Sequence, residues 1–213
     1  MPHIRTLMIG LAMTIACTTP AAAQITREPR LAVAFGVGRV DPVPIHLPYT
    51  ARTWSAAIQI TAAKHLIIEG AVGGWRHTAT DDFEQFGRVG SPELVLLYRA
   101  KSELHDSKTL VSVSAIAAAT IGRLRLRSGA GVGRAVFATD YSETITECAV
   151  AQACRSGPPY RSSIGLFSMQ GVLGLDVAVA HQLRASLTYR LSQPFTAALG
   201  DNSVLAGFTL GLR

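Results

Sequence analysis

The sequence lacks a hydrophobic segment long enough to cross a membrane as an α-helix. Such a helix needs roughly 20 consecutive apolar residues, and the longest candidate, Leu110 to Gly122, is shorter and contains serine and threonine. Charged residues are also scarce, at 16% of the chain, against roughly 25% in a typical soluble domain. Because a closed β-barrel is the only other structure that satisfies every backbone polar group in lipid, a membrane protein of this composition is expected to be a barrel.

Clusters of basic residues with aromatic residues are lacking as well. The formal net charge of the 213 residues is +6, but the basic residues are dispersed and alternate with apolar ones. This distribution argues against a nucleic-acid-binding surface. We expect the basic side chains to meet carboxylates inside a barrel and anionic lipid headgroups.

A period of two runs along much of the chain. In LRASLTYRL, from Leu183 to Leu191, leucine, alanine and tyrosine alternate with arginine, serine and threonine. Side chains alternate between faces on a β-strand, whereas a helix would scatter the arginines among the leucines. The same pattern predicts eight strands, at about 31–40, 52–61, 66–77, 109–121, 124–138, 164–178, 183–191 and 203–212.

The connections between these strands alternate in length. Those at 62–65, 122–123 and 180–182 are short, and those at 78–108, 139–161 and 193–202 are long. Outer-membrane barrels have short periplasmic turns and long external loops. Within the first long connection, Glu93 to Ala100 itself has the composition of a strand. Since single-chain bacterial barrels have even strand numbers, we place it in an external hairpin or strand extension; the alternative is a strand of the barrel wall.

The first 23 residues have the features of a signal peptide. A basic start with His3 and Arg5 precedes a short apolar core, and three alanines end at Ala23. This arrangement predicts cleavage before Gln24 and a barrel domain over 24–213. The alternative is a short N-terminal anchor helix.

Two cysteines remain after the predicted cleavage. Cys148 and Cys154 lie in one polar segment, TECAVAQACRSG. Export places the chain in an oxidising compartment, where a local disulfide between them is expected. A metal site would need further ligands nearby, and the segment supplies none.

Charged residues fall on the face that carries few large apolar groups. They are Glu69, Arg127, Asp176, Arg184 and Arg190. Charges in a narrow lumen lose hydration, so each needs a partner. We predict a lumen charge network in which Arg127 pairs with Asp176 on the neighbouring strand and Glu69 reaches toward Arg127 or Arg184. The alternative is that each arginine meets lumen water.

From about Leu31 to Arg213 the chain resembles the small eight-stranded outer-membrane barrels, a group that includes the transmembrane domain of outer-membrane protein A and porin-like barrels. The resemblance lies in the signal peptide, the alternating strands, the segment SGAGVGRAVF and the terminal LAGFTLGL. It departs from the family at Arg213, where an aromatic is usual, and at Leu205, where a polar residue is usual.

This resemblance implies an all-β, antiparallel, up-and-down transmembrane barrel of eight strands in the outer membrane of a Gram-negative envelope. The implied partners are outer-membrane lipid, lipopolysaccharide and, during insertion, the barrel-assembly machinery. We expect a monomer that does not bind nucleic acid.

No arrangement of residues indicates catalysis. Ser192 has no neighbouring histidine, and the cluster of Asp81, Asp82 and Glu84 near His77 is typical of a solvated acidic loop. We therefore predict no catalytic, cofactor-binding or metal-binding residues and no cofactor. Eight strands leave an interior that side chains just fill, which favours a structural or surface-interaction role. The alternatives are a narrow pore for small solutes and, less favoured, a barrel enzyme acting on lipid or peptide.

Overall fold

The computed structural model describes residues 30–42, 51–89, 94–148, 156–196 and 200–212, and these contain eight β-strands and no helix. The strands are β1 (Leu31–Pro42), β2 (Ala51–Ala63), β3 (Leu66–Val89), β4 (Leu94–Ile121), β5 (Leu124–Cys148), β6 (Tyr160–Ala178), β7 (Leu183–Pro194) and β8 (Asp201–Leu212). Among these residues no helix is long and apolar enough to cross a membrane, a finding that does not bear on crossings made by strands. The predicted signal peptide, residues 1–23, lies outside the described residues.

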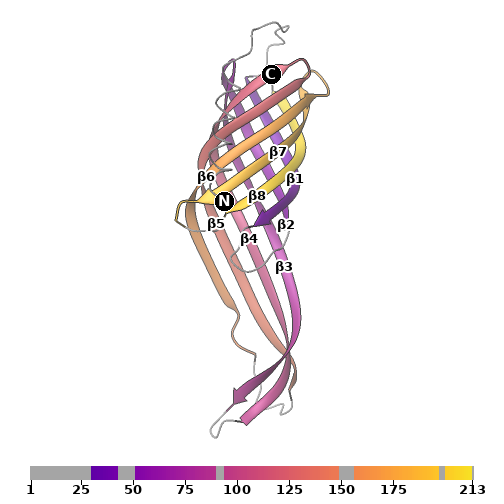
Figure 1. Cartoon of the computed structure of the whole chain (residues 1–213), viewed down its shortest axis with the longest axis vertical. Helices are drawn as coiled ribbons and strands as arrows, with labels where there is room; N and C mark the ends of the chain where they lie inside the picture. The colour runs from indigo at the N-terminus through magenta and orange to yellow at the C-terminus, as the bar shows by residue number, and fades with distance from the viewer. Residues whose placement is uncertain (1–29, 43–50, 90–93, 149–155, 197–199, 213) are drawn as a thin grey trace, which may run out of the picture. The chain divides into compact units, whose positions relative to one another are not determined.

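The strands follow one another in chain order around a closed barrel (Figure 1). Antiparallel pairing of β1 with β8 closes the ring, from Leu31 opposite Leu212 to Pro42 opposite Asp201. Each strand thus finds hydrogen-bonding partners on both sides, and no open sheet edge is left where the ring closes. The predicted eight-stranded up-and-down barrel is confirmed.

Contacts divide the chain into two compact units. We call residues 1–75, 109–135 and 166–213 the barrel unit, and residues 76–108 and 136–165 the hairpin unit. The barrel unit holds the short turns and all of β1, β2, β7 and β8.

The short turns lie where the sequence predicts them. Two residues join β2 to β3 and two join β4 to β5, and four residues join β6 to β7. Gly122 in the second turn has a φ of 60°, a left-handed conformation that glycine adopts without steric cost. A glycine at this point therefore permits the tight reversal.

The prediction of long loops at 78–108 and 139–161 is wrong for most of their length. β3 continues to Val89 and β4 begins at Leu94, while β5 continues to Cys148 and β6 begins at Tyr160. Leu94–Ala100 is thus part of a strand extension, the favoured placement in the prediction, and Glu93 lies outside the described residues. These strands could not be predicted because their side chains are polar on both faces. Alternation of apolar and polar residues shows only that one face is buried, whereas the hydrogen bonds of a β-ladder are made by the backbone.

Burial in the barrel unit follows the predicted alternation. Large apolar side chains point outward and are exposed, with Val37 at 68%, Ile58 at 55% and Leu187 at 52%. The inward faces carry polar side chains that are nevertheless buried, such as Gln59 and Ser114. The barrel is therefore apolar outside and polar inside, the reverse of a soluble barrel.

Polar contacts connect strands within the hairpin unit. Arg99 Nη2 on β4 lies 2.5 Å from Glu84 Oε1 on β3, and Arg99 Nη1 lies 3.5 Å from Glu147 Oε2 on β5. The hydrogen bond that Arg99 donates to the Glu84 carboxylate and the negative charge of Glu147 raise the pKa of the Arg99 guanidinium. Burial and the nearby carboxylate of Glu143 raise the pKa of the Tyr141 phenol. The Arg99 guanidinium on β4 thus links β3 and β5 through Glu84 and Glu147.

Candidate functional site

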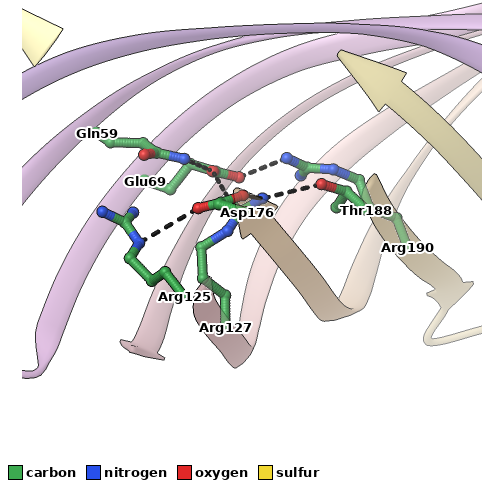
Figure 2. A network of polar contacts seen from close by, with 7 residues as sticks. All are labelled: Gln59, Glu69, Arg125, Arg127, Asp176, Thr188 and Arg190. Carbon is green, nitrogen blue, oxygen red and sulfur yellow. Dashed lines mark hydrogen bonds and ion pairs between the residues drawn. The ribbon is translucent and has the colours of Figure 1, made fainter. Parts of the chain in front are cut away.

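A cluster of charged and polar side chains occupies the lumen of the barrel unit. Figure 2 shows its members, which converge from different strands of the wall. The lumen cluster consists of Gln59 on β2, Glu69 on β3, Arg125 and Arg127 on β5, Asp176 on β6, and Thr188 and Arg190 on β7. All lie on the inward face because successive side chains of a strand point to opposite faces, and the residues on either side of each member point outward.

Asp176 lies between two arginines of the neighbouring strand. Its Oδ1 is 2.9 Å from Arg127 Nη2, and its Oδ2 is 3.2 Å from Arg125 Nε. These contacts are ion pairs without hydrogen-bond alignment, since neither carboxylate oxygen accepts a hydrogen bond within the described part of the chain. Arg127 Nη2 instead donates to Thr188 Oγ1 at 3.0 Å. Asp176 therefore acts mainly through its charge.

Glu69 joins the opposite side of the cluster. Its Oε1 accepts a hydrogen bond from Arg190 Nη2 at 2.5 Å, and its Oε2 accepts one from Gln59 Nε2 at 2.7 Å. Arg127 Nη1 lies 3.9 Å from the same Oε2. Arg127 therefore lies between the two carboxylates, and the cluster spans five strands, β2, β3, β5, β6 and β7, as one network (Figure 2).

The cluster is nearly closed to solvent. Glu69 is 1% exposed, Asp176 is 0% exposed, and Arg127 is 4% exposed. A small cavity of about 20 Å³ beside it is lined by Glu69, Arg127 and Arg190 among others. A polar cavity needs roughly 10–15 Å³ to hold one water, so this space suits an ordered water rather than a solute path.

The structure brings together Glu69, Arg127, Asp176 and Arg190 of the five residues predicted for the lumen network. Arg184 lies on the same strand face as Arg190, six positions earlier, and is opposite Ala178 on β6 and Thr209 on β8. The prediction gave Arg127 or Arg184 as the partner of Glu69, and in the structure Glu69 contacts Arg127 and Arg190. Alternation predicts which face of the strand a residue lies on, but not its level along the barrel axis. Only the strand register shows which of the two arginines of β7, Arg184 or Arg190, lies beside Glu69.

Sequence reasoning missed three members of the cluster. Gln59 and Thr188 carry no charge, and the predicted network does not include Arg125, which pairs with Asp176. A second buried polar contact was also missed, in which Trp75 Nε1 donates to Asp201 Oδ2 at 3.0 Å. No signal in the sequence links Trp75 with a residue 126 positions away.

Within the acidic group near His77, which consists of Asp81, Asp82 and Glu84, the side chain of Glu84 has a structural role. Glu84 is engaged with Arg99, and the backbone carbonyl of Asp81 accepts a hydrogen bond from Ser102 Oγ at 3.4 Å. Among the described residues no group of histidine, cysteine and carboxylate side chains could hold a metal ion. The cluster in the lumen can fix charges and exclude solutes, and it offers no exposed nucleophile beside a base.

The disulfide between Cys148 and Cys154 stays a prediction, because Cys148 ends β5 and Cys154 lies outside the described residues. We expect no free thiol in mature protein isolated without reductant. Because the closed loop is short, reduction should lower the free energy of unfolding by about 2 kcal/mol at most. Thiol titration in denaturant, before and after reduction, measures the pairing. Quantitative titration before reduction would contradict it.

No protein-family model and no curated protein sequence matches the chain. Solved structures do match. Neisserial surface protein A is 10% identical with a TM-score of 0.51, and the match covers 85% of this chain and 97% of that one. The attachment invasion locus protein Ail of Yersinia pestis is 12% identical with a TM-score of 0.46, covering 86% and 98%.

The outer membrane protein OprG from Pseudomonas aeruginosa is 11% identical with a TM-score of 0.45, covering 86% of this chain and 95% of that one. Scores below 0.5 do not establish a common fold, so the likeness rests on neisserial surface protein A. At 10% identity it concerns the fold alone. The resemblance to small outer-membrane barrels is thus confirmed at the level of the fold.

Proposed function

We propose that the protein is a non-enzymatic outer-membrane barrel with a structural or surface-interaction role, whose lumen is closed to solutes. The observation that carries this proposal is the buried charge cluster inside a barrel with an apolar exterior. Side chains such as Val37, Ile58 and Phe167 are more than half exposed, which in water would be costly and in lipid is favourable.

A closed lumen favours this role over the alternative of a narrow pore. Glu69 and Arg127 are almost fully buried and meet across the interior. Moving a solute through would require separating ion pairs in a space with little water, where an unpaired charge is costly. Beside the cluster, the described residues leave a cavity of only about 20 Å³, which is too small for a substrate.

The hairpin unit is the part that we assign to surface interaction. Its strands carry carboxylates and basic groups on exposed side chains, among them Asp82, Glu84, Arg99 and Arg161. A polar strand surface of this kind suits contact with an aqueous partner rather than with lipid. The proposed further partners are outer-membrane lipid and lipopolysaccharide, and the proposed state is a monomer.

Reconstitution into planar bilayers tests the closed lumen. Protein whose folding is verified by heat-modifiability on a gel should insert without producing steady conductance. The expectation follows from the ion pairs of Asp176 and Glu69, which fill the interior. Steady channels carried by the folded protein would favour the pore, and recovery of the cellular protein in a soluble fraction would reject the membrane role altogether.

A further inference from the structure

The barrel end that carries the short turns has exposed basic residues along the part of the ring from β1 to β5. Arg30 precedes β1, Lys64 lies in the β2–β3 turn and Arg123 lies in the β4–β5 turn. All three side chains are exposed, and we call them the basic rim. Because the strands close in chain order, the three residues lie at different points around the ring rather than in one patch.

Backbone hydrogen bonds fix the position of this rim. At each site the carbonyl of a rim or turn residue accepts from the amide of the neighbouring strand. These bonds join Thr61 N to Arg30 O, Ala118 N to His65 O, and Ala178 N to Arg123 O, each at 2.9 Å. The charged side chains therefore extend from the ordered end of the barrel wall.

No exposed carboxylate offsets the rim among the described residues of this end. The described turns contain Lys64, His65, Gly122 and Arg123, and the β6–β7 turn contains His181, without aspartate or glutamate. Asp176 is close in sequence but faces the lumen and is 0% exposed. Among the described residues of this end, the positive charge is thus not neutralised by an exposed carboxylate.

Exposed apolar side chains begin directly beside the rim. Ile121 and Leu124 flank the turn of Arg123 and are 62% and 47% exposed, and Leu31 follows Arg30. Further members of this apolar border are Ile60, Leu66, Val179 and Leu212. Basic groups at the edge of an apolar band lie where the phosphates of a bilayer leaflet lie, above the hydrocarbon.

We propose that the basic rim binds the headgroups of anionic phospholipids in the leaflet at the short-turn end of the barrel. The inference rests on the proposed membrane anchoring. A lipid surface fits better than a soluble anionic partner for two reasons. The charges are spread over three separate points from β1 to β5 instead of gathering in one patch, and they continue directly into the apolar surface that lipid chains would cover.

Local fluorescence quenching tests which lipid lies at the rim. The probe is Ile121→Trp combined with Trp54→Phe, because Ile121 is exposed beside the turn and the remaining Trp75 is buried. The protein is reconstituted in phosphatidylcholine containing a minor fraction of phosphatidylglycerol. Bromine is placed on the chains of one lipid or the other, and the ratio of quenching gives the relative affinity of the rim for the anionic lipid.

Removing the rim charges should lower that relative affinity. We expect Arg30→Gln, Lys64→Gln and Arg123→Gln together to reduce it about fivefold at low salt. The probe at position 121 lies beside Arg123 only, and fivefold corresponds to the attraction of one basic residue near an anionic surface. The difference should shrink at high salt because mobile ions screen exposed charges. If the triple variant fails the heat-modifiability check, Arg123→Gln alone is expected to lower the affinity in the same direction.

The matched control removes equal charge elsewhere. Arg39→Gln, Arg52→Gln and Arg134→Gln neutralise three exposed arginines of β1, β2 and β5 away from the turns, and should leave quenching at position 121 unchanged. An equal fall in both variants, or none in either, would overturn the proposal while leaving membrane anchoring intact. Absence of quenching by brominated phosphatidylcholine would mean that the barrel had not inserted, and would overturn the anchoring and this inference together.

Discussion

Replacing Asp176 with asparagine is expected to lower the free energy of unfolding by about 3 kcal/mol. The carboxylate is fully buried and lies within ion-pair distance of Arg125 and Arg127. Asparagine keeps the shape of the side chain but removes the charge between the two guanidiniums, which stay in a poorly hydrated lumen. Urea unfolding in micelles, followed by tryptophan fluorescence, measures the change.

Asp41→Asn is the matched control for that variant. Asp41 is an exposed carboxylate on β1, and its loss changes the net charge equally, so its effect should stay within about 0.5 kcal/mol. Planar bilayers provide a second readout, in which Asp176→Asn should leak where the native barrel is silent. Unchanged stability together with a silent bilayer would show that the ion pairs do not hold the lumen closed.

Replacing Gly207 with alanine is expected to weaken the β1–β8 junction and to lower the free energy of unfolding by about 2 kcal/mol. Gly207 on β8 lies opposite Gly36 on β1. A Cβ on Gly207 would collide with the carbonyl oxygen of Phe35 and lie 2.7 Å from the Cα of Gly36. Both obstacles are backbone atoms, so they cannot move aside without separating the strands that close the ring.

Gly70→Ala provides the comparison for Gly207→Ala. Gly70 lies on β3 and is exposed, and no atom lies within 4 Å of a Cβ built on it. Its substitution should therefore leave stability within about 0.5 kcal/mol. Urea midpoints and the fraction of heat-modifiable protein report both variants. Equal stability of the two alanine variants would mean that the junction can adapt to a methyl group.

The face of each barrel strand could be predicted from the sequence because the β period is exactly two. Glu69, Arg127 and Asp176 were placed inward solely by their phase relative to leucine, valine and isoleucine, and all three are buried. The short turns were found for a related reason: alternation stops and restarts within two to four residues. Strand count, closure and the polar interior all follow from this one pattern.

The lengths of β3 to β6 could not be obtained in the same way. Between Thr78 and Lys108 polar residues occupy both faces, so no alternation separates strand from loop, although backbone hydrogen bonding continues through most of the segment. The same applies beyond Ala138 on β5. The composition of these segments indicates only that neither face of the strand is required to be apolar, so it does not show where the strand ends.

The sequence by itself determined the class of fold, the apolar exterior and the set of charges that point inward, because these depend on local alternation. The sequence also predicted that Arg127 lies beside Asp176 on the neighbouring strand, but only the tertiary structure decided that Arg125 and Arg190 complete the contacts of the two carboxylates. Asp176 lies between Arg125 and Arg127, and Glu69 pairs with Arg190 rather than Arg184. Those pairings depend on the stagger of strands around a closed ring. The stagger decides which side chains of different strands lie at the same level along the barrel axis, and the period of a single strand does not contain this information.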